Sequence, residues 1–244
     1  MTARGTGQLA QADLASLAQA SGIDLESYRQ AHVSACVARA LARHGTHSVA
    51  GLARLCRRDP AVRATLRHSI LVPVTGMFRD PEQFELLGRR VLPALLWPGR
   101  GVSVWSAGCS DGSELYSVVL MLRRPGALDG SRLIGSDLSA GRLRLARRGA
   151  VVSETVRRDA RPVLRWERRD LLREPPPPEA FDLVLCQNVA IYFEPSAQQA
   201  VHAKLAGALR EGGMLLLGHC EQLLRPGALG LAAAGPHMYR KVAA

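Results

Sequence analysis

The stretch that decides the fold reads Val102-Ser103-Val104-Trp105-Ser106-Ala107-Gly108-Cys109-Ser110-Asp111-Gly112. Its first half is a short apolar run, which is typical of a buried strand. Gly108 and Gly112 then punctuate a turn, and a helical pattern follows from residue 113 to about residue 124. A glycine turn between a strand and a helix lets a ligand approach backbone that side chains would otherwise block. The stretch therefore predicts a ligand site after a first strand.

The alternation of strand and helix continues to the end of the chain. A closing hairpin is predicted over residues 229–233 and 237–242. Strands that alternate with helices form a parallel sheet covered on both faces. We therefore expect an α/β fold with a Rossmann-like sheet, its other strands at 132–137, 163–167, 182–186 and 214–218 and its other helices at 139–148 and 196–210.

A helical region precedes this sheet. Residues 9–70 hold four helical patterns separated by short breaks, the first of them at Gly22. We expect a small all-helical domain over residues 1–74, followed by a second domain over residues 75–244. Arg39 and Arg43 lie four residues apart and so share a helix face, which is either a solvated polar face or a docking surface for an acidic partner.

Composition and charge exclude several classes of protein. The 244 residues carry 32 basic and 21 acidic side chains, a net charge of +11, and 47% of the residues are apolar, which excludes a disordered chain. Thirty of the basic residues are arginines. Arginine binds carboxylates and phosphates alike, so the charge favours an acidic partner without choosing between protein and nucleic acid. A surface that simply carries excess arginine is the alternative.

Neither a metal nor a membrane is indicated. The five cysteines include no C-x-x-C pair, and His44 and His47 stand without a cluster of ligands, so we expect buried reduced thiols and no zinc. The sequence contains no apolar run of the ~18–20 residues that a membrane helix requires. Its N-terminus lacks the apolar core of a secretory signal. We expect a cytoplasmic protein.

Two familiar motifs fit the glycine turn poorly. Gly108 to Gly112 matches the G-x-S-x-G of hydrolases, but no persuasive acid-then-histidine order follows it, and the G-x-G-x-x-G of dinucleotide sites is absent. Asp137 fits better, because it ends the second predicted strand 29 residues beyond Gly108. A carboxylate at that place can accept both hydroxyls of a ribose. Its alternative role is to cap the helix at 139–148.

Four sequence blocks together resemble a known family. They are Thr75-Gly76-Met77-Phe78-Arg79-Asp80-Pro81, the stretch from Val104 to Gly112, Cys186-Gln187-Asn188-Val189-Ala190-Ile191-Tyr192-Phe193, and Leu217-Gly218-His219-Cys220-Glu221. In order and spacing they are similar to the chemotaxis-receptor glutamate methyltransferases, the CheR family, over nearly the whole chain. The resemblance implies a class I S-adenosylmethionine-dependent methyltransferase that esterifies glutamates on an acidic helical chemoreceptor and releases S-adenosylhomocysteine. We expect a monomer.

The resemblance also implies roles for individual residues. Tyr192 matches the tyrosine that faces the transferred methyl group and is the predicted catalytic residue. Arg39 and Arg43 fall where the basic helix of the family meets the receptor. The predicted cofactor contacts are Thr75 and Arg79 before the sheet, Gly108 and Glu114 at the turn, Asp137 at the ribose, Asp170 and Leu171 beside the adenine, and Gln187 and Asn188 near the methionine moiety.

The chemistry of the acceptor agrees with this assignment. A glutamate side chain has a pKa of ~4.3 and is already ionised at neutral pH, so its methylation requires no general base. The enzyme must align the carboxylate with the methyl group and exclude water, and proximity supplies most of the rate.

The chain departs from the family pattern at four places. Asp111 stands where the family has threonine, Ser113 replaces the first of two glutamates, and Pro73 replaces an asparagine or threonine. Only 45 residues separate Asp137 from Asp182, so the small β-subdomain that the family carries there is shortened or absent. These departures put cofactor affinity and receptor recognition in question.

Three other functions stay open at this point. The net charge and the eleven arginines between residues 142 and 173 suggest a nucleic-acid methyltransferase, although the segment after Asn188 lacks the Pro-Pro-aromatic loop of such enzymes. The altered turn suggests a non-catalytic protein that binds the cofactor on the same fold. A methyltransferase for small carboxylic acids is the third.

Overall fold

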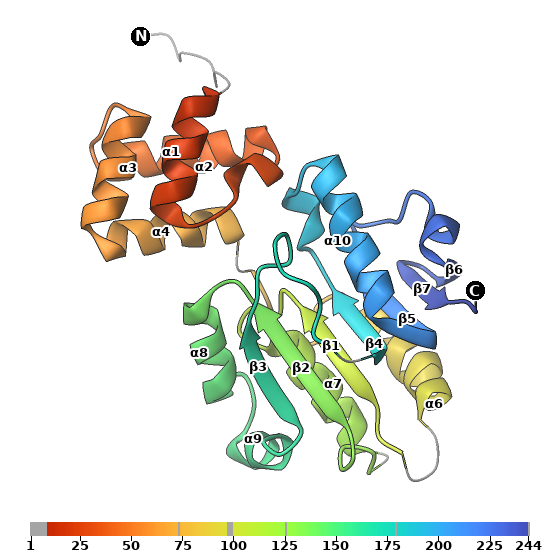
Figure 1. Ribbon diagram of the computed structural model, residues 1–244. Helices are drawn as coiled ribbons and strands as arrows, with labels where there is room; N and C mark the ends of the chain where they lie inside the picture. The colour runs from red at the N-terminus through yellow and green to blue at the C-terminus, as the bar shows by residue number, and fades with distance from the viewer. Residues whose placement is uncertain (1–8, 73, 97–99, 125, 179, 244) are drawn as a thin grey trace. The chain divides into compact units, whose positions relative to one another are not determined.

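The computed structural model describes residues 9–72, 74–96, 100–124, 126–178 and 180–243. The chain divides into two compact units, the first comprising Met1–Pro73 with Tyr192–Ala197 and the second comprising Val74–Ile191 with Gln198–Ala244 (Figure 1). The segment Tyr192–Ala197 therefore packs with the helical unit, although it follows the fourth strand in sequence. Pro73, one of the departures noted above, lies outside the described residues.

The first unit is helical, as the sequence predicts. Its helices start where the local chemistry favours a start: the Ser48 hydroxyl accepts a hydrogen bond from the Gly51 N–H at 3.1 Å, and the Asp59 carboxylate accepts one from the Ala61 N–H at 2.7 Å. Gly22 ends the first helix with a φ of 69°. The elements are α1 (Gln11–Ser21), η1 (Leu25–Ser27), α2 (Gln30–Arg43), α3 (Val49–Arg58) and α4 (Pro60–Leu71).

The second unit is built on a seven-stranded sheet in the order β3-β2-β1-β4-β5-β7-β6. The first five strands are parallel, and β7 is antiparallel to both β5 and β6. This arrangement confirms the Rossmann-like sheet and the closing hairpin. The strands are β1 (Ser103–Ala107), β2 (Arg132–Asp137), β3 (Leu164–Arg168), β4 (Phe181–Cys186), β5 (Leu209–Leu217), β6 (Leu231–Gly235) and β7 (Met238–Lys241).

Apolar side chains on the sheet and its helices form the core of this unit. Central strands are buried on both faces, and all six residues of β4 are buried. Helix α7 contributes Leu115, Val118, Val119 and Leu122, each fully buried against the sheet. The helices of the unit are α5 (Pro81–Leu86), the π-helical turn η2 (Leu87–Val91), α6 (Leu92–Leu95), α7 (Ser113–Arg123), α8 (Ala140–Arg148), α9 (Glu154–Ala160), η3 (Ala190–Tyr192), α10 (Pro195–Ala208) and η4 (Pro226–Leu229), with η3 and α10 running into the segment assigned to the first unit.

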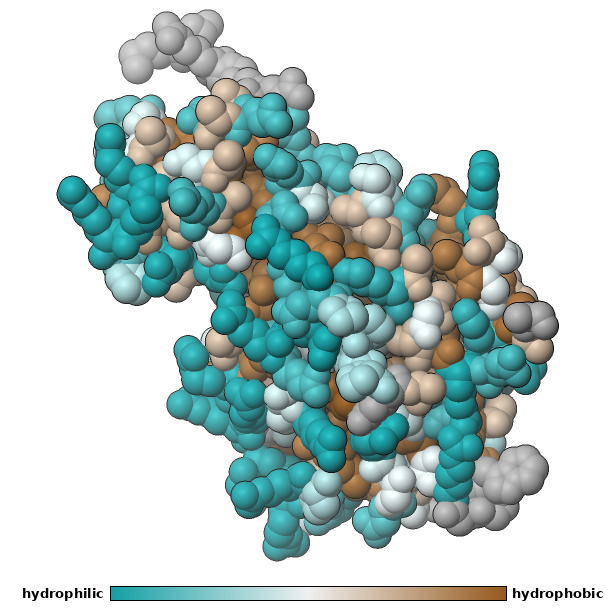
Figure 2. Space-filling view, viewed as in Figure 1, coloured by the Kyte–Doolittle hydropathy of each residue, from teal (hydrophilic) through white to brown (hydrophobic). Residues whose placement is uncertain are grey.

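The structure corrects the sequence-based boundaries in a few places. The helix predicted to end at residue 210 ends at Ala208, and β5 begins at once, several residues before the predicted strand. Helix α9 was not predicted, because it is only seven residues long and most of them are polar. The arginine-rich segment lies on α8, α9 and β3, and hydrophilic side chains cover this part of the surface (Figure 2). Among the described residues, no helix is long and apolar enough to cross a membrane.

Candidate functional site

The candidate site lies at the carboxyl edge of the sheet in the second unit. Strands β1, β2, β4 and β5 are parallel, so the segments that follow them meet at one edge. These segments are the glycine turn at 108–112, Asp137, the loop at 187–191 and the turn at 218–221. Three of these segments carry predicted cofactor residues, namely Gly108, Asp137, and Gln187 with Asn188, and these residues therefore meet at one edge of the sheet.

The glycine turn needs glycine for lack of space as well as for its backbone angles. Gly108 has a φ of 80°, and a Cβ atom there would lie 2.5 Å from the Val189 side chain. Gly112 has a φ of 84°, and its Cβ would lie 2.6 Å from the ring of Trp166. The N–H groups of Gly108 and Cys109 both donate to the Ser136 carbonyl, at 2.8 and 2.9 Å. These two N–H groups fix the turn to β2 and are not directed at a phosphate group.

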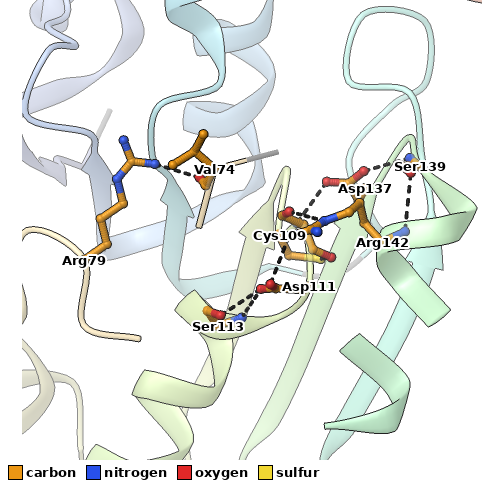
Figure 3. A network of polar contacts seen from close by, with 9 residues as sticks. Val74, Arg79, Cys109, Asp111, Ser113, Asp137, Ser139 and Arg142 are labelled. Atoms are coloured by element: carbon orange, nitrogen blue, oxygen red, sulfur yellow. Dashed lines mark hydrogen bonds and ion pairs between the residues drawn. The ribbon is translucent and has the colours of Figure 1, made fainter. Parts of the chain in front are cut away.

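Asp137 is held at the end of β2 by backbone N–H groups. Its Oδ2 accepts from Ser110 N–H at 2.9 Å and its Oδ1 from Ser139 N–H at 2.7 Å (Figure 3). Burial raises the pKa of Asp137, while the two N–H donors and Arg142 lower it. The cap of α8 is the Ser139 side chain, which accepts from the Arg142 N–H at 3.3 Å. Asp137 is thus not needed as the helix cap, and its remaining lone pairs can accept from ribose hydroxyls.

Glu114 provides a second carboxylate on the turn. Its Oε1 accepts from the hydroxyl of Ser106 on β1 at 2.7 Å. Burial raises the pKa of Glu114 to about 7, the Ser106 bond and Arg79 oppose this, and the negative charge of Glu221 adds to it. Near neutral pH this group therefore changes charge readily, and a bound cation would favour its ionised form.

A buried carboxylate that the sequence did not single out holds the loop after β4. Glu221 is 1% exposed. Its Oε2 accepts from the N–H groups of Asn188 and Gly218 at 2.7 and 2.9 Å, and its Oε1 accepts from those of Ala190 and Val189 at 2.8 and 3.2 Å. Asn188 has a φ of 58°, so this loop needs external support. The only signal in the sequence was that Glu221 ends the fourth family block.

Gln83, which the sequence analysis also did not identify, joins Gln187 to the segment before the sheet. The Gln187 Nε2 donates to Oε1 of Gln83 at 2.6 Å, and the Gln83 Nε2 donates to the Leu217 carbonyl at 3.2 Å. Gln83 is 7% exposed and thus ties α5 to both β4 and β5. In the same segment Arg79 donates to the Val74 carbonyl at 2.8 Å, and Thr75 is half-buried.

The loop after β3 carries Asp170 and Leu171, the residues predicted beside the adenine. Its carbonyl groups converge on Lys204 of α10, whose Nζ donates to Leu171 at 2.9 Å, to Leu172 at 2.8 Å and to Glu174 at 3.1 Å. A lysine ammonium has three donors around one atom, so it suits three converging carbonyls better than a planar arginine fork does. One of the two lysines of the chain is therefore used to hold this loop.

The other predicted residues lie in the helical unit. Tyr192 begins the segment that packs there: its carbonyl accepts from the Arg29 N–H at 2.8 Å, and its ring lies 4.9 Å from that of His32, centroid to centroid. Arg39 and Arg43 lie on α2, the helix that contains His32, and both are exposed. Helix α2 thus carries the predicted docking residues and also contacts the predicted catalytic tyrosine.

The donor set of the carboxyl edge fits S-adenosylmethionine, which combines a sulfonium, an ammonium and a carboxylate with a ribose and an adenine. The carboxylates of Asp137 and Glu114 suit hydroxyl groups and cationic groups. The Nδ2 of Asn188 is buried and has no hydrogen-bond partner, so it has a donor to offer a carboxylate. Within the described residues, no group of histidine, cysteine and carboxylate side chains is placed to hold a metal ion.

Replacing Asp137 by alanine tests the ribose assignment. We expect Asp137→Ala to weaken cofactor binding about 100-fold, because hydrogen bonds to a charged group contribute ~1.5–3 kcal/mol each. Equilibrium dialysis with S-adenosylmethionine measures the affinity, and a thermal melt checks that the turn has not unfolded. Asp137→Asn is the matched control. It removes the charge but keeps one oxygen that can accept a hydrogen bond from the N–H of Ser110 or Ser139. Wild-type affinity in the alanine variant contradicts the assignment.

The raised pKa of Glu114 predicts two pH effects. The folded chain holds this proton up to about pH 7, whereas the unfolded chain releases it near its ordinary pKa of 4.5. The contribution of Glu114 to stability therefore falls as the pH rises from about 4.5 to about 7. Affinity for the cationic cofactor should rise over the same range, because the carboxylate becomes charged. Urea unfolding and cofactor titration across this range measure both effects. Glu114→Gln should remove them, and pH curves that run parallel in the two proteins contradict the prediction.

Comparison with known proteins identifies the family. The model of the CheR methyltransferase S-adenosylmethionine-binding domain matches residues 73–158 and 152–230. A chemotaxis protein methyltransferase of Listeria innocua is 28% identical over 242 residues, covering 90% of this chain and 92% of that protein. Chemotaxis protein methyltransferase 1 of Pseudomonas aeruginosa is 30% identical over 242 residues, covering 85% and 87%. Among solved structures, CalS10 with bound S-adenosylmethionine, an amino pentose methyltransferase from Micromonospora echinaspora, is 22% identical with a TM-score of 0.41 over 56% of this chain and 49% of that chain. The match to the family model covers more than half of the chain, and the chain belongs to the CheR family of S-adenosylmethionine-dependent methyltransferases.

Proposed function

We propose that this protein esterifies glutamate side chains of a chemoreceptor or a related chemosensory protein. The observation that carries the proposal is the family match over residues 73–230, together with chemotaxis methyltransferases that align with 85–90% of the chain. When bound, S-adenosylmethionine supplies an electrophilic methyl group, which the acceptor carboxylate takes up as an ester. Since that carboxylate is ionised at neutral pH, the protein has to bind, orient and exclude water, and needs no base.

Different residues of the carboxyl edge would bind different parts of the cofactor. Asp137 would hold the ribose hydroxyls, and Asp170 with Leu171 would border the adenine. Gln187 and Asn188 would contact the methionine moiety, where the unpartnered Asn188 amide supports the assignment. Glu114 would face the positive charge of the cofactor, which would favour the ionised form of this carboxylate against the burial that raises its pKa to about 7. Thr75, Arg79 and Gly108 would complete the wall of the site.

The acceptor would be recognised by the helical unit. Arg39 and Arg43 are exposed on α2 and could pair with the carboxylates of an acidic helix. Tyr192 would face the transferred methyl group and limit the access of water. Its backbone and ring are held by Arg29 and His32, so the same unit that docks the acceptor fixes the proposed catalytic side chain.

Methyl transfer to an acidic receptor fragment tests the proposal. The purified protein is incubated with methyl-labelled S-adenosylmethionine and the cytoplasmic helices of a chemoreceptor from the same genome. We expect label on the receptor that mild base releases as methanol, because methyl esters are base-labile. A receptor whose acceptor glutamates are changed to glutamine is the control and should stay unlabelled. Base-stable label, label on nucleic acid, or cofactor binding without any transfer contradicts the proposal.

Two variants separate docking from chemistry in this assay. Tyr192→Phe should lower the rate about tenfold, the value of one hydrogen bond of ~1–1.5 kcal/mol, with S-adenosylhomocysteine affinity unchanged. Arg39→Glu with Arg43→Glu should raise the KM for the receptor and also leave that affinity unchanged. An unchanged turnover in Tyr192→Phe removes its proposed role, and a parallel loss of cofactor affinity in either variant indicates a folding defect.

A further inference from the structure

Asp111, which departs from the family pattern, is fully engaged within the protein. Its Oδ1 accepts from the N–H and the hydroxyl of Ser113, at 3.2 and 2.7 Å. Its Oδ2 accepts from the Nη2 of Arg142 at 2.9 Å, and the two side chains of this ion pair are only 17% and 18% exposed. Ser113 is the second departure at this turn, and its hydroxyl donates to the first. The two departures and Arg142 thus form one unit.

Arg142 also reaches the centre of the turn. Its Nε donates to the Ser110 hydroxyl at 2.8 Å, and the Ser110 N–H donates in turn to Asp137 at 2.9 Å. Figure 3 shows the labelled members of this network, with Arg142 on α8, Asp111 in the turn and Asp137 at the end of β2. A single guanidinium therefore contacts two consecutive residues of the turn, one of which positions the predicted ribose acid.

The turn requires such support because of its backbone. Ser110 has a φ of 50°, in the left-handed region that is unfavourable for a residue with a side chain. It lies between Gly108 and Gly112, which also have positive φ values of 80° and 84°. A strained residue persists only where surrounding contacts determine its conformation. The hydrogen bonds that Ser110 accepts from Arg142 and donates to Asp137 hold its side chain and its N–H in place.

The charge of Asp111 sets a second requirement. A largely buried carboxylate without a partner is costly, and removing one partner of such a pair is strongly unfavourable. Without Arg142, the turn could relieve that cost by moving Asp111 toward solvent. Such a movement would displace Ser110 and with it the N–H group that orients Asp137. The planar fork of arginine, with fixed donors for two acceptors, suits this task better than a lysine would.

From this geometry we propose that Arg142 is a positioning residue for cofactor binding, acting through Asp111 and Ser110 on Asp137. The inference rests on the proposed function only in taking S-adenosylmethionine and its product as the ligands of this edge. It accounts for both departures in the turn: the Asp111 carboxylate and the Ser113 hydroxyl are one structural solution, completed by an arginine on the next helix. The altered turn therefore keeps the internal contacts that a cofactor-binding turn requires.

A double-mutant cycle on the ion pair tests the inference. Calorimetric titration with S-adenosylhomocysteine gives the Kd, and a thermal melt gives the stability of each variant. We expect Arg142→Gln to raise the Kd about tenfold, because it removes the hydrogen bond to Ser110 and leaves the largely buried Asp111 carboxylate without its cation. Asp111→Asn with Arg142→Gln should lower the Kd about threefold relative to the single variant without restoring it, since the neutral amide still accepts from Ser113 but the hydrogen bond from Arg142 to Ser110 is still missing. Arg144→Gln, an exposed arginine on the same helix, is the matched control and should bind normally.

Each result of the cycle decides between positioning and a purely structural role. A raised Kd in Arg142→Gln without a matching loss of thermal stability, partly reversed in the double variant, supports the inference, because a purely structural role would lower the melting temperature and leave the affinity of the folded protein unchanged. Wild-type affinity in Arg142→Gln overturns it, as does a Kd in the double variant that is no lower than in the single one. A wild-type protein that binds S-adenosylhomocysteine but esterifies no receptor refutes the proposed function alone.

Discussion

Hydrogen bonds from backbone N–H groups to two carboxylates, the half-buried Asp137 and the buried Glu221, are the interaction on which the carboxyl edge of this sheet depends. Asp137 fixes the turn after β1, and Glu221 fixes the loop after β4 through three N–H groups of that loop and accepts a fourth from Gly218 in its own turn. Both loops contain a residue other than glycine at positive φ, namely Ser110 and Asn188. The carboxylates offset that strain, so the polar groups of the predicted cofactor site are ordered before any ligand binds. Burial raises the pKa of both acids, and their hydrogen bonds from backbone N–H groups oppose that rise.

The sequence predicted the sheet well because its strands are short, apolar and bounded by glycine or by a charged residue. The range 132–137 was predicted to the residue, and the hairpin order of the last two strands was correct. Helix α9 was not predicted because it is only two turns long and has just two apolar positions, Val156 and Ala160, facing the core. The predicted end of α10 was wrong because β5 begins at Leu209, directly after Ala208, so no residue separates the helix from the strand.

The supporting contacts of the site could not be predicted, for a physical reason. Glu221 and Lys204 bind backbone N–H and carbonyl groups, which every residue type supplies, at a separation of about 30 residues. The sequence therefore holds no complementary residue that would reveal them. Asp111 and Arg142 are a complementary pair, but the segment offers many arginines, and only the fold selects this one. That Tyr192 belongs to the helical unit could not be predicted either, because it depends on the path of the backbone after β4.

The most direct test of the account is a calorimetric titration of the wild-type protein with S-adenosylhomocysteine, since it requires no knowledge of the acceptor. The central claim is that the altered turn still forms a working cofactor site. The account predicts saturable binding to one site with a micromolar Kd, which corresponds to about 8 kcal/mol. A folded protein that gives no heat and no thermal shift at millimolar ligand would contradict it, and the chain would then be a binding module that has kept the fold without the cofactor.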